Sequence, residues 1–146
     1  MPDNVLGPLS EINRLIRENR IAEFQSPNLA LGLRPLEFSA GRSRWSWETQ
    51  PPQVLNPFGL IQGGYLALFV DDLLSTAIGS VLEEGEWAVT AETKVTYVRA
   101  LKPSSLIGEA RVVRRSRALA FLEASVAERG GEIAVLASST WAISRR

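Results

Sequence analysis

A long apolar segment in the middle of the chain restricts the fold more than any other feature. Between residues 65 and 82 nearly every position is apolar or small, and only Asp71 and Asp72 are charged. A helix that is apolar on all sides is typically surrounded by other structure. We therefore predict a central helix over residues 64–82, ended by the sequence Glu83-Glu84-Gly85. A carboxylate inside such a helix loses several kcal/mol of solvation unless it gains a partner, a shifted pKa or a function.

The segments around this helix are typical of antiparallel β-structure. Residues 89–98 alternate between an apolar face that begins with Val89 and a polar face that begins with Thr90. Strands are predicted over residues 31–38, 42–49, 89–98, 106–113, 119–127 and 133–143, and an amphipathic helix over residues 9–24 with Ser10 as its N-cap. This order predicts a single α+β domain over residues 1–146, with one antiparallel sheet wrapped around the central helix and an extra N-terminal helix.

The absence of histidine and cysteine excludes several kinds of active site. The 146 residues contain neither, which rules out serine–histidine–aspartate triads, cysteine nucleophiles, histidine-ligated zinc and disulfides. Sixteen basic and sixteen acidic residues give a formal net charge of zero, so there is no general attraction for nucleic acid or an anionic membrane. Because no apolar run is long enough to span a membrane or resembles a leader sequence, we expect a cytoplasmic protein.

The sequence that leads into the central helix carries the most specific motif. Asn56 and Gly59 form an Asn-x-x-Gly element, Gly63 and Gly64 open the helix, and Asp71 follows eight residues after Gly63. Together with the strands that follow, this pattern resembles the hotdog-fold acyl-CoA thioesterases of the phenylacetic-acid-degradation (PaaI-like) type. The resemblance covers roughly residues 55–143 and implies a hotdog fold, in which an antiparallel sheet wraps around a long central helix.

Gly63 and Asp71 are the residues that this resemblance makes central. The first amides of a helix lack acceptors and carry the positive end of the dipole, so the amide of Gly63 suits the oxyanion that forms when water attacks a thioester. The resemblance implies that Asp71 is the general base or the nucleophile. Asp72, about 100° around the helix, is the rival candidate. A salt bridge with an arginine is the structural alternative for either aspartate.

Four further positions are weaker candidates for catalysis. Ser75 lies beside Asp71 by i, i+4 spacing and would hold the attacking water. Asn56 would order the lead-in loop or hydrogen-bond the thioester carbonyl, and Thr90 matches a small hydroxyl residue of relatives. Gln62 stands where relatives usually have a histidine, and a glutamine can form hydrogen bonds but cannot carry a proton.

Binding of coenzyme A is predicted from a glycine, several large apolar side chains and a set of basic residues. Gly64 is expected to contact the substrate, with an acyl pocket lined by Tyr65, Leu68, Phe69, Trp87 and Phe121. Trp45, Trp47 and Trp141 are expected in the core or in an interface. The phosphates would bind a basic cluster of Arg111, Arg114, Arg115 and Arg117, with Arg99 and Lys102 nearby, because the guanidinium fork suits phosphate. Arg99, Arg114, Arg115 and Arg117 are the predicted binding residues. A solvated hairpin explains the same arginines equally well.

These features predict hydrolysis of an acyl-CoA or aryl-CoA thioester to the free acid and coenzyme A, without a metal or a redox cofactor. A non-catalytic acyl-CoA sensor or carrier is the alternative. A hotdog dehydratase is disfavoured, because those enzymes use a histidine. The resemblance also implies a homodimer with active sites shared between subunits, and we expect a homotetramer. Neither nucleic acid nor a membrane is predicted as a partner.

Overall fold

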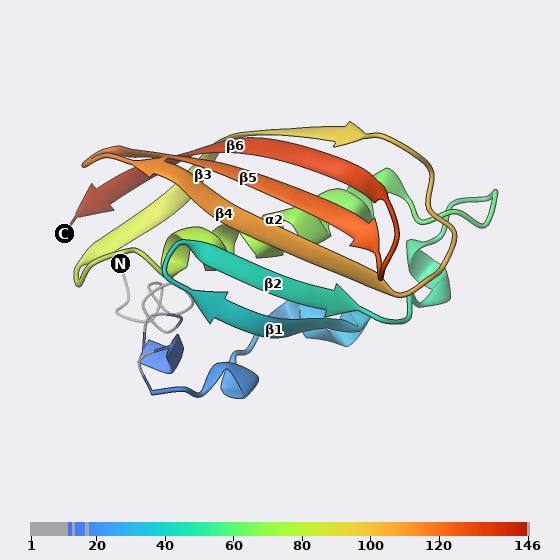
Figure 1. Ribbon diagram of the computed structural model, residues 1–146, viewed down its shortest axis with the longest axis horizontal. Helices are drawn as coiled ribbons and strands as arrows, with labels where there is room; N and C mark the ends of the chain where they lie inside the picture. Colours follow the sequence, from blue (N-terminus) through green and yellow to red (C-terminus); the bar gives the residue numbers. More distant parts are fainter. Residues whose placement is uncertain (1–11, 13, 17, 146) are drawn as a thin grey trace.

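A six-stranded antiparallel sheet curves around one long helix (Figure 1). The computed structural model describes residues 12, 14–16 and 18–145. The strands are β1 (Leu33–Ser39), β2 (Arg42–Trp47), β3 (Glu86–Tyr97), β4 (Leu106–Arg115), β5 (Leu119–Glu128) and β6 (Ile133–Arg145), and the helix is α2 (Gly63–Gly79). Their order across the sheet is β1-β2-β4-β5-β6-β3. This arrangement confirms the predicted α+β hotdog fold.

The helix α2 is buried as its sequence predicted, because it packs along β4, β2 and β5. Close approach to β4 depends on Gly108, where a Cβ atom would lie only 2.5 Å from Leu73 Cδ1. The helix ends at Gly79 and not at residue 82. Ser80 explains the earlier end: its hydroxyl donates to the carbonyl of Ala77 and accepts the amide of Gly41, which fastens this turn to the β1–β2 connection.

The strand β3 lies at one edge of the sheet and contains a bulge. Its register with β6 shifts between Thr90 and Glu92, so Ala91 is the additional residue. The prediction that Val89 shares an apolar face with Tyr97 is therefore wrong. A bulge exchanges the two faces of a strand, and Val89 points outward with 47% of its surface exposed while Ala88 is buried.

The N-terminal segment is less regular than predicted. The first part of the predicted helix, including Ser10, lies outside the described residues, and residues 14–16 are helical. The helix does not continue through residue 24, because Asn19 adopts a left-handed conformation with φ 55°. Two short 3₁₀ helices follow, η2 (Ile21–Glu23) and η3 (Pro27–Leu31). A third, η4 (Pro52–Val54), lies in the loop before α2. Among the described residues, no helix is long and apolar enough to cross a membrane.

Candidate active site

The first turn of α2 presents backbone amides that are free to bind a ligand. The carbonyl of Gln62 accepts the amides of Tyr65 and Leu66, at 3.0 and 3.3 Å. Within the described part of the chain, the amides of Gly63 and Gly64 have no acceptor. The side chain of Gln62 is exposed and does not cap the helix. Two donors at the positive end of the helix dipole therefore remain available to an anion or a polarised carbonyl oxygen.

The loop before α2 is held in place by Asn56. Its Oδ1 accepts the amides of Phe58 and Leu60, at 2.9 and 3.1 Å, and Gly59 closes the turn with φ +75°. Beyond the turn, the amide of Gln62 donates to the carbonyl of Val54. Asn56 thus orders the lead-in loop, which was one of its two predicted roles, and its Oδ1 is occupied by this loop.

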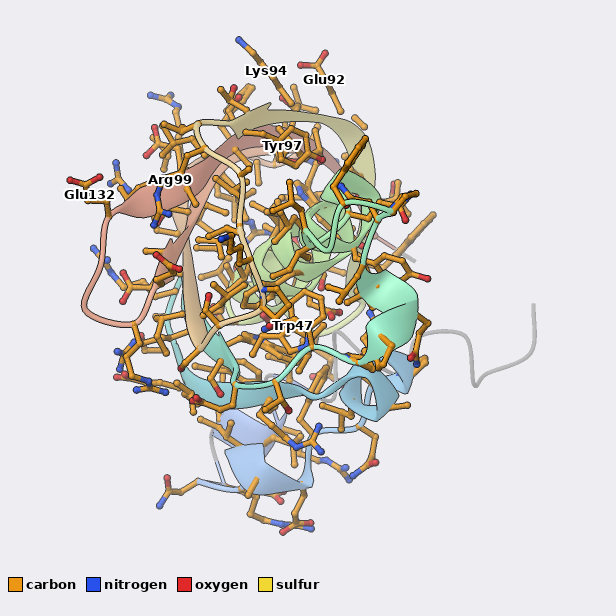
Figure 2. The ribbon with its side chains drawn as sticks, turned by 90° about the vertical axis from the view of Figure 1, so that its right-hand side faces the viewer. Trp47, Glu92, Lys94, Tyr97, Arg99 and Glu132 are labelled. Carbon is orange, nitrogen blue, oxygen red and sulfur yellow. The ribbon has the colours of Figure 1, made fainter. Side chains whose placement is uncertain are left out.

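Tyr97 is a neighbour of Gly63 that the sequence analysis missed. Its hydroxyl donates to the carbonyl of Gly63 at 2.7 Å, across 34 residues of sequence. A Cβ atom on Gly63 would lie 3.1 Å from Tyr97 Cζ, whereas one on Gly64 would meet nothing within 4 Å. Figure 2 shows Tyr97 turned toward the helix, while Glu92 and Lys94 of the same strand point away. The alternation of β3 indicated the side on which Tyr97 lies, but not its contact with Gly63.

The two adjacent aspartates of α2 differ in their surroundings. Asp71 is exposed in this chain, and partial desolvation raises the pKa of its carboxyl. Asp72 is buried, with 9% of its surface exposed, and Oδ2 accepts the side-chain amide of Asn28 at 2.9 Å. Burial raises the pKa of Asp72 to about 6; the Asn28 hydrogen bond opposes this shift and the charge of Asp71 adds to it. Neither aspartate forms a salt bridge with an arginine among the described residues.

The buried Asp72 should make the stability of the protein depend on pH. The pKa of Asp72 is about 6 in the folded protein and 3.8 in the unfolded chain, so the folded state binds the proton more tightly. The free energy of unfolding therefore falls as the pH rises from 3.8 to about 6. This loss is on the order of 3 kcal/mol. Asp72→Asn should therefore raise the free energy of unfolding at neutral pH and flatten its pH dependence, measured by denaturant unfolding. A less stable variant at neutral pH would instead mean that the hydrogen bond from Asn28 to the ionised carboxylate outweighs the cost of its desolvation.

Ser75 and Thr90 are not brought to the glycines. The hydroxyl of Ser75 donates to the backbone carbonyl of Asp72 at 3.1 Å, so it is engaged within its own helix. Thr90 is exposed on β3, immediately before the bulge, and pairs with Trp141 in the register of the sheet. Within the described part of the chain, neither hydroxyl forms a hydrogen bond with Gly63, and the predicted roles of Ser75 beside Asp71 and of Thr90 stay predictions.

The candidates for the acyl pocket lie in different places. Tyr65 and Leu68 are half-buried on α2, and Phe69 is fully buried against Trp47 at a ring-centroid distance of 5.8 Å. Phe121 does not lie beside these residues within one chain, and its place in the acyl pocket stays a prediction. It lies between the buried Ala120 and Leu122 on β5, so it points to the outer face of the sheet, where 42% of its surface is exposed. Trp45, Trp47 and Trp141 are buried, as expected.

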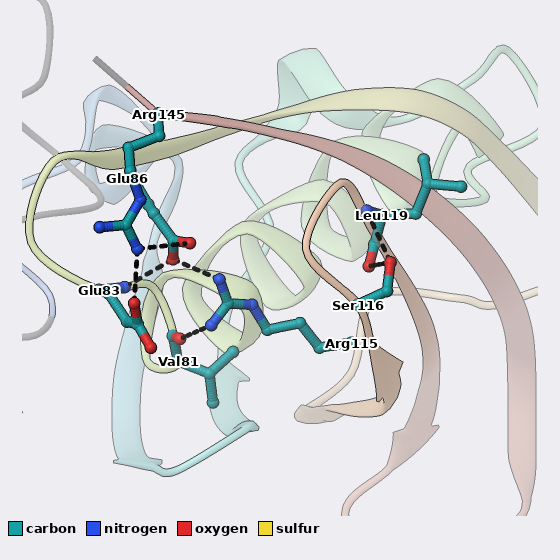
Figure 3. A network of polar contacts seen from close by, with 7 residues as sticks. All are labelled: Val81, Glu83, Glu86, Arg115, Ser116, Leu119 and Arg145. Atoms are coloured by element: carbon teal, nitrogen blue, oxygen red, sulfur yellow. Dashed lines mark hydrogen bonds and ion pairs between the residues drawn. The ribbon is translucent and has the colours of Figure 1, made fainter.

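The predicted basic cluster is divided between the two ends of the sheet. Arg115 forms a salt bridge with Glu86 and donates to the carbonyl of Val81 beyond the C-terminus of α2 (Figure 3). Arg99 lies near the other end, where it pairs with Glu128 at 2.8 Å and donates to the carbonyl of Glu132 (Figure 2). Arg114 and Arg117 are exposed at the same end of the sheet as Arg115. Lys102 is exposed near the loop before α2, because the carbonyl of the preceding residue, Leu101, accepts the amide of Ile61. The arginines therefore do not form one phosphate site within a chain.

An open groove of about 530 Å³ crosses the outer face of the sheet. Its walls include Arg42, Lys94, Arg111, Glu123, Leu136 and Ser138, whereas Gly63 and Asp71 lie on the helix side. Arg111 and Glu123 pair with each other across this face at 2.8 Å. Over the residues that the structure describes, no group of three or more acidic side chains is arranged to hold a metal ion. The groups that α2 presents are the backbone amides of Gly63 and Gly64 and the carboxylate of Asp71.

Comparison with known proteins identifies a matching family. A family model described as the thioesterase superfamily matches residues 58–135, just over half of the chain. A Saccharolobus solfataricus protein named provisionally as an esterase is 23% identical over 137 residues, which cover 94% of this chain and 86% of the relative. The span that matches the family model, residues 58–135, includes the first turn of α2, Asp71 and Tyr97.

Solved structures show the same fold. A Ralstonia eutropha protein provisionally named as a phenylacetic acid degradation-related thioesterase superposes with a TM-score of 0.76 at 24% identity, covering 90% of this chain and 98% of the other. A Streptococcus pneumoniae protein described as a hypothetical thioesterase, solved with coenzyme A, gives a TM-score of 0.71 at 19% identity, covering 78% and 87%. The resemblance inferred from the sequence is confirmed by these matches.

Proposed function

The chain belongs to the thioesterase superfamily and is an enzyme of that family, and from this premise we propose that it hydrolyses an acyl-CoA or aryl-CoA to the free acid and coenzyme A. The observation that carries the proposal is the pair of free amides at Gly63 and Gly64, on the same helix as Asp71. Each chain thus carries both kinds of group that hydrolysis of a thioester needs, unpaired amide donors and an exposed carboxylate, and a site would combine the amides of one chain with the carboxylate of another.

The amides would stabilise the charge that develops during the reaction. Water adds to the thioester carbonyl, whose oxygen becomes an oxyanion, and the C–S bond then breaks to release coenzyme A as the thiol. A fixed amide donor at the oxyanion is worth about 3 kcal/mol of the barrier. Glycine at position 63 lets the backbone approach the substrate, while the exposed Gln62 beside it can add a hydrogen bond but not a proton.

Asp71 would supply the base or the nucleophile. As a general base it accepts a proton from the attacking water and returns it to the departing thiolate. As a nucleophile it attacks the carbonyl itself, the C–S bond breaks to expel the thiolate of coenzyme A, and water then hydrolyses the resulting anhydride to the free acid and the Asp71 carboxylate. Desolvation raises the pKa of Asp71, which strengthens it as a base provided that it stays ionised. Ser75 and Thr90 would assist only through water or through a second subunit.

Two chains are needed to form such a site. Asp71 follows Gly63 by eight residues of continuous helix, which corresponds to about 12 Å along the axis. A carboxylate at that distance cannot reach a water molecule that attacks a carbonyl held by Gly63. The unpaired edge of β3, with Val89 exposed, supports association with a second copy. We therefore propose a homodimer with shared active sites, and a homotetramer stays a prediction.

Coenzyme A is proposed as the thiol partner from the family and from charge. The Streptococcus pneumoniae neighbour was solved with this molecule. Arg114 and Arg117 are exposed cations without a partner among the described residues and are our first candidates for the phosphates, whereas Arg115 and Arg99 are held by glutamates. Tyr65 and Leu68 would border the acyl group. The proposed reaction uses water, a carboxylate and amides, so it requires no cofactor, and the cytoplasmic location stays a prediction.

The proposal is tested by the release of free thiol from a panel of short, long and aromatic acyl-CoA esters. We expect turnover of at least one class by the purified protein, detected with a thiol reagent. Matching oxygen esters serve as controls, because their poorer leaving group should make them slower substrates. Tight binding of acyl-CoA without turnover of any ester would contradict the proposal. That outcome would favour the sensor or carrier, with Gln62 in place of the family histidine as the first explanation.

A further inference from the structure

We propose that Tyr97 is a positioning residue, which fixes the backbone of Gly63 so that the flanking amides are aimed at the reacting carbonyl. The inference rests on the proposed thioester hydrolysis and adds a residue to its machinery. Tyr97 does not need to touch the substrate for this role. It acts through the hydrogen bond from its hydroxyl to the carbonyl of Gly63, at 2.7 Å.

The position of Tyr97 is determined by the sheet. It is the last residue of β3 and pairs with the fully buried Val135 of β6. Immediately after it, the amide of Val98 donates to the carbonyl of Ala134 at 2.8 Å. The backbone is therefore tied to the β6 segment both at Tyr97 and at the next residue, and the side chain of Tyr97 reaches from the sheet to the first turn of α2. The phenol thus connects the glycine to a rigid element and not to another loop.

The contact between Tyr97 and Gly63 is so close that a Cβ atom at position 63 would make a tighter contact than most Cβ atoms do. A Cβ atom there would lie 3.1 Å from Cζ and 3.3 Å from both Cε1 and the hydroxyl oxygen of Tyr97. The equivalent atom on Gly64 would have open space around it. A side chain at position 63 would therefore displace the Tyr97 ring by a few tenths of an ångström, so glycine here favours the Tyr97 contact as well as access for the substrate.

The geometry of the peptide group explains how a bond to the carbonyl positions an amide. The peptide that joins Gly63 and Gly64 is planar, with the Gly63 carbonyl on one edge and the Gly64 amide on the other, so fixing one fixes the direction of the other. Two consecutive glycines have unusual conformational freedom. Stabilisation of an oxyanion depends on donors that are already in place. A hydrogen bond at the carbonyl also polarises the amide, because linked hydrogen bonds strengthen one another.

The exposure of Tyr97 argues against a purely structural role. Its side chain is 47% exposed, and its hydroxyl would be solvated if the bond to Gly63 were absent. An exposed hydrogen bond of this kind contributes little to the free energy of unfolding. The hydroxyl is thus expected to matter for the orientation of the first turn of α2 more than for the stability of the fold.

Tyr97→Phe tests the proposal, because it removes the hydroxyl and keeps the ring. With the acyl-CoA that the wild type turns over fastest, we expect kcat to fall about five- to tenfold, KM to change less than about twofold, and the melting temperature to stay the same. Thr96→Val is the matched control. It removes a hydroxyl from the preceding residue of β3, which pairs with the exposed Leu136 on the outer face, and should leave all three quantities unchanged.

A second measurement keeps the test independent of activity. In spectra of the ¹⁵N-labelled protein, Tyr97→Phe should move the amide resonance of Gly64 more than those of other residues on α2, and Thr96→Val should not. An unchanged kcat would overturn the proposal, as would a raised KM with an unchanged kcat, because the latter would mean that Tyr97 binds substrate. If the wild type cleaves no thioester, the proposed function fails, and the Gly64 resonance alone then decides whether Tyr97 holds this peptide.

Discussion

Asp71→Asn is expected to abolish thioester turnover while acyl-CoA binding is retained. An asparagine has nearly the same shape as the aspartate but can neither accept a proton from water nor attack a carbonyl, so kcat should fall by about 10²- to 10⁴-fold. Binding should persist, because the free amides of Gly63 and Gly64 and the exposed arginines are unchanged. The measurement pairs single-ester kinetics with calorimetric titration of an acyl-CoA. The wild-type rate should rise with pH as Asp71 loses its proton, through a pKa that desolvation holds above 3.8.

Asp72→Asn is the matched control for this experiment. It makes the same chemical change one residue away, at a carboxyl that is buried and bonded to Asn28. Turnover should persist in this variant. If Asp72→Asn loses activity and Asp71→Asn keeps it, the assignment of the two aspartates is reversed. If both variants keep full activity, α2 does not supply the base.

Labelled water separates the two roles that remain open for Asp71. In a single turnover, ¹⁸O from water that enters the carboxyl group of Asp71 would show that an anhydride formed and that water attacked its Asp71 carbonyl, which simple general-base catalysis excludes. Mass spectrometry of the peptide that contains Asp71 detects this label.

The elements with the strongest hydrophobic pattern were predictable from the sequence. The nearly continuous apolar run after Gly64 required a covered helix, and the later strands followed from alternation and turns, such as the glycine pair after Arg129. Local sequence is sufficient to predict such elements. A helix that is buried on all sides needs apolar residues at nearly every position, whereas a strand that is buried on one side needs them at every second position. The free amides at Gly63 followed from the same reasoning, since every helix leaves its first donors unpaired.

Features that depend on distant contacts were not predictable in this way. The bulge at Ala91 changes which residues of β3 face the helix, and it is visible only in the pairing with β6. Arg99 and Arg115 were grouped because both are basic, but the sheet places them beside different glutamates. The contact of Tyr97 with Gly63 likewise joins segments that the chain separates by 34 residues. Each of these depends on the register and curvature of the sheet and not on local composition.

Glu86→Gln is expected to cost about 3 kcal/mol of stability, because it removes one partner of a largely buried ion pair. The side chain of Glu86 is only 6% exposed and accepts hydrogen bonds from Arg115, from Arg145 and from the amide of Glu83 at 2.8 Å (Figure 3). These contacts join the ends of β3, β4 and β6 to the turn after α2. With glutamine, the partly buried guanidinium of Arg115 loses its counter-charge and keeps only neutral acceptors, the amide oxygen of the new side chain and the carbonyl of Val81. Denaturant unfolding at neutral pH measures the loss.

Glu123→Gln is the control, since Glu123 pairs with Arg111 on the exposed face of the sheet, where such a pair contributes at most about 1 kcal/mol.

The stabilising effect of Glu86 should also depend on pH. Burial alone would raise the pKa of Glu86, but the hydrogen bond from the Glu83 amide and the charge of Arg115 outweigh burial, so the pKa is lowered. A carboxyl with a lowered pKa stabilises the fold above its ordinary pKa and loses that contribution as pH falls through the folded value. The difference between wild type and Glu86→Gln should therefore shrink in acid. If Glu86→Gln and Glu123→Gln lower the free energy of unfolding equally, the buried Glu86 network stabilises the fold no more than an exposed ion pair does.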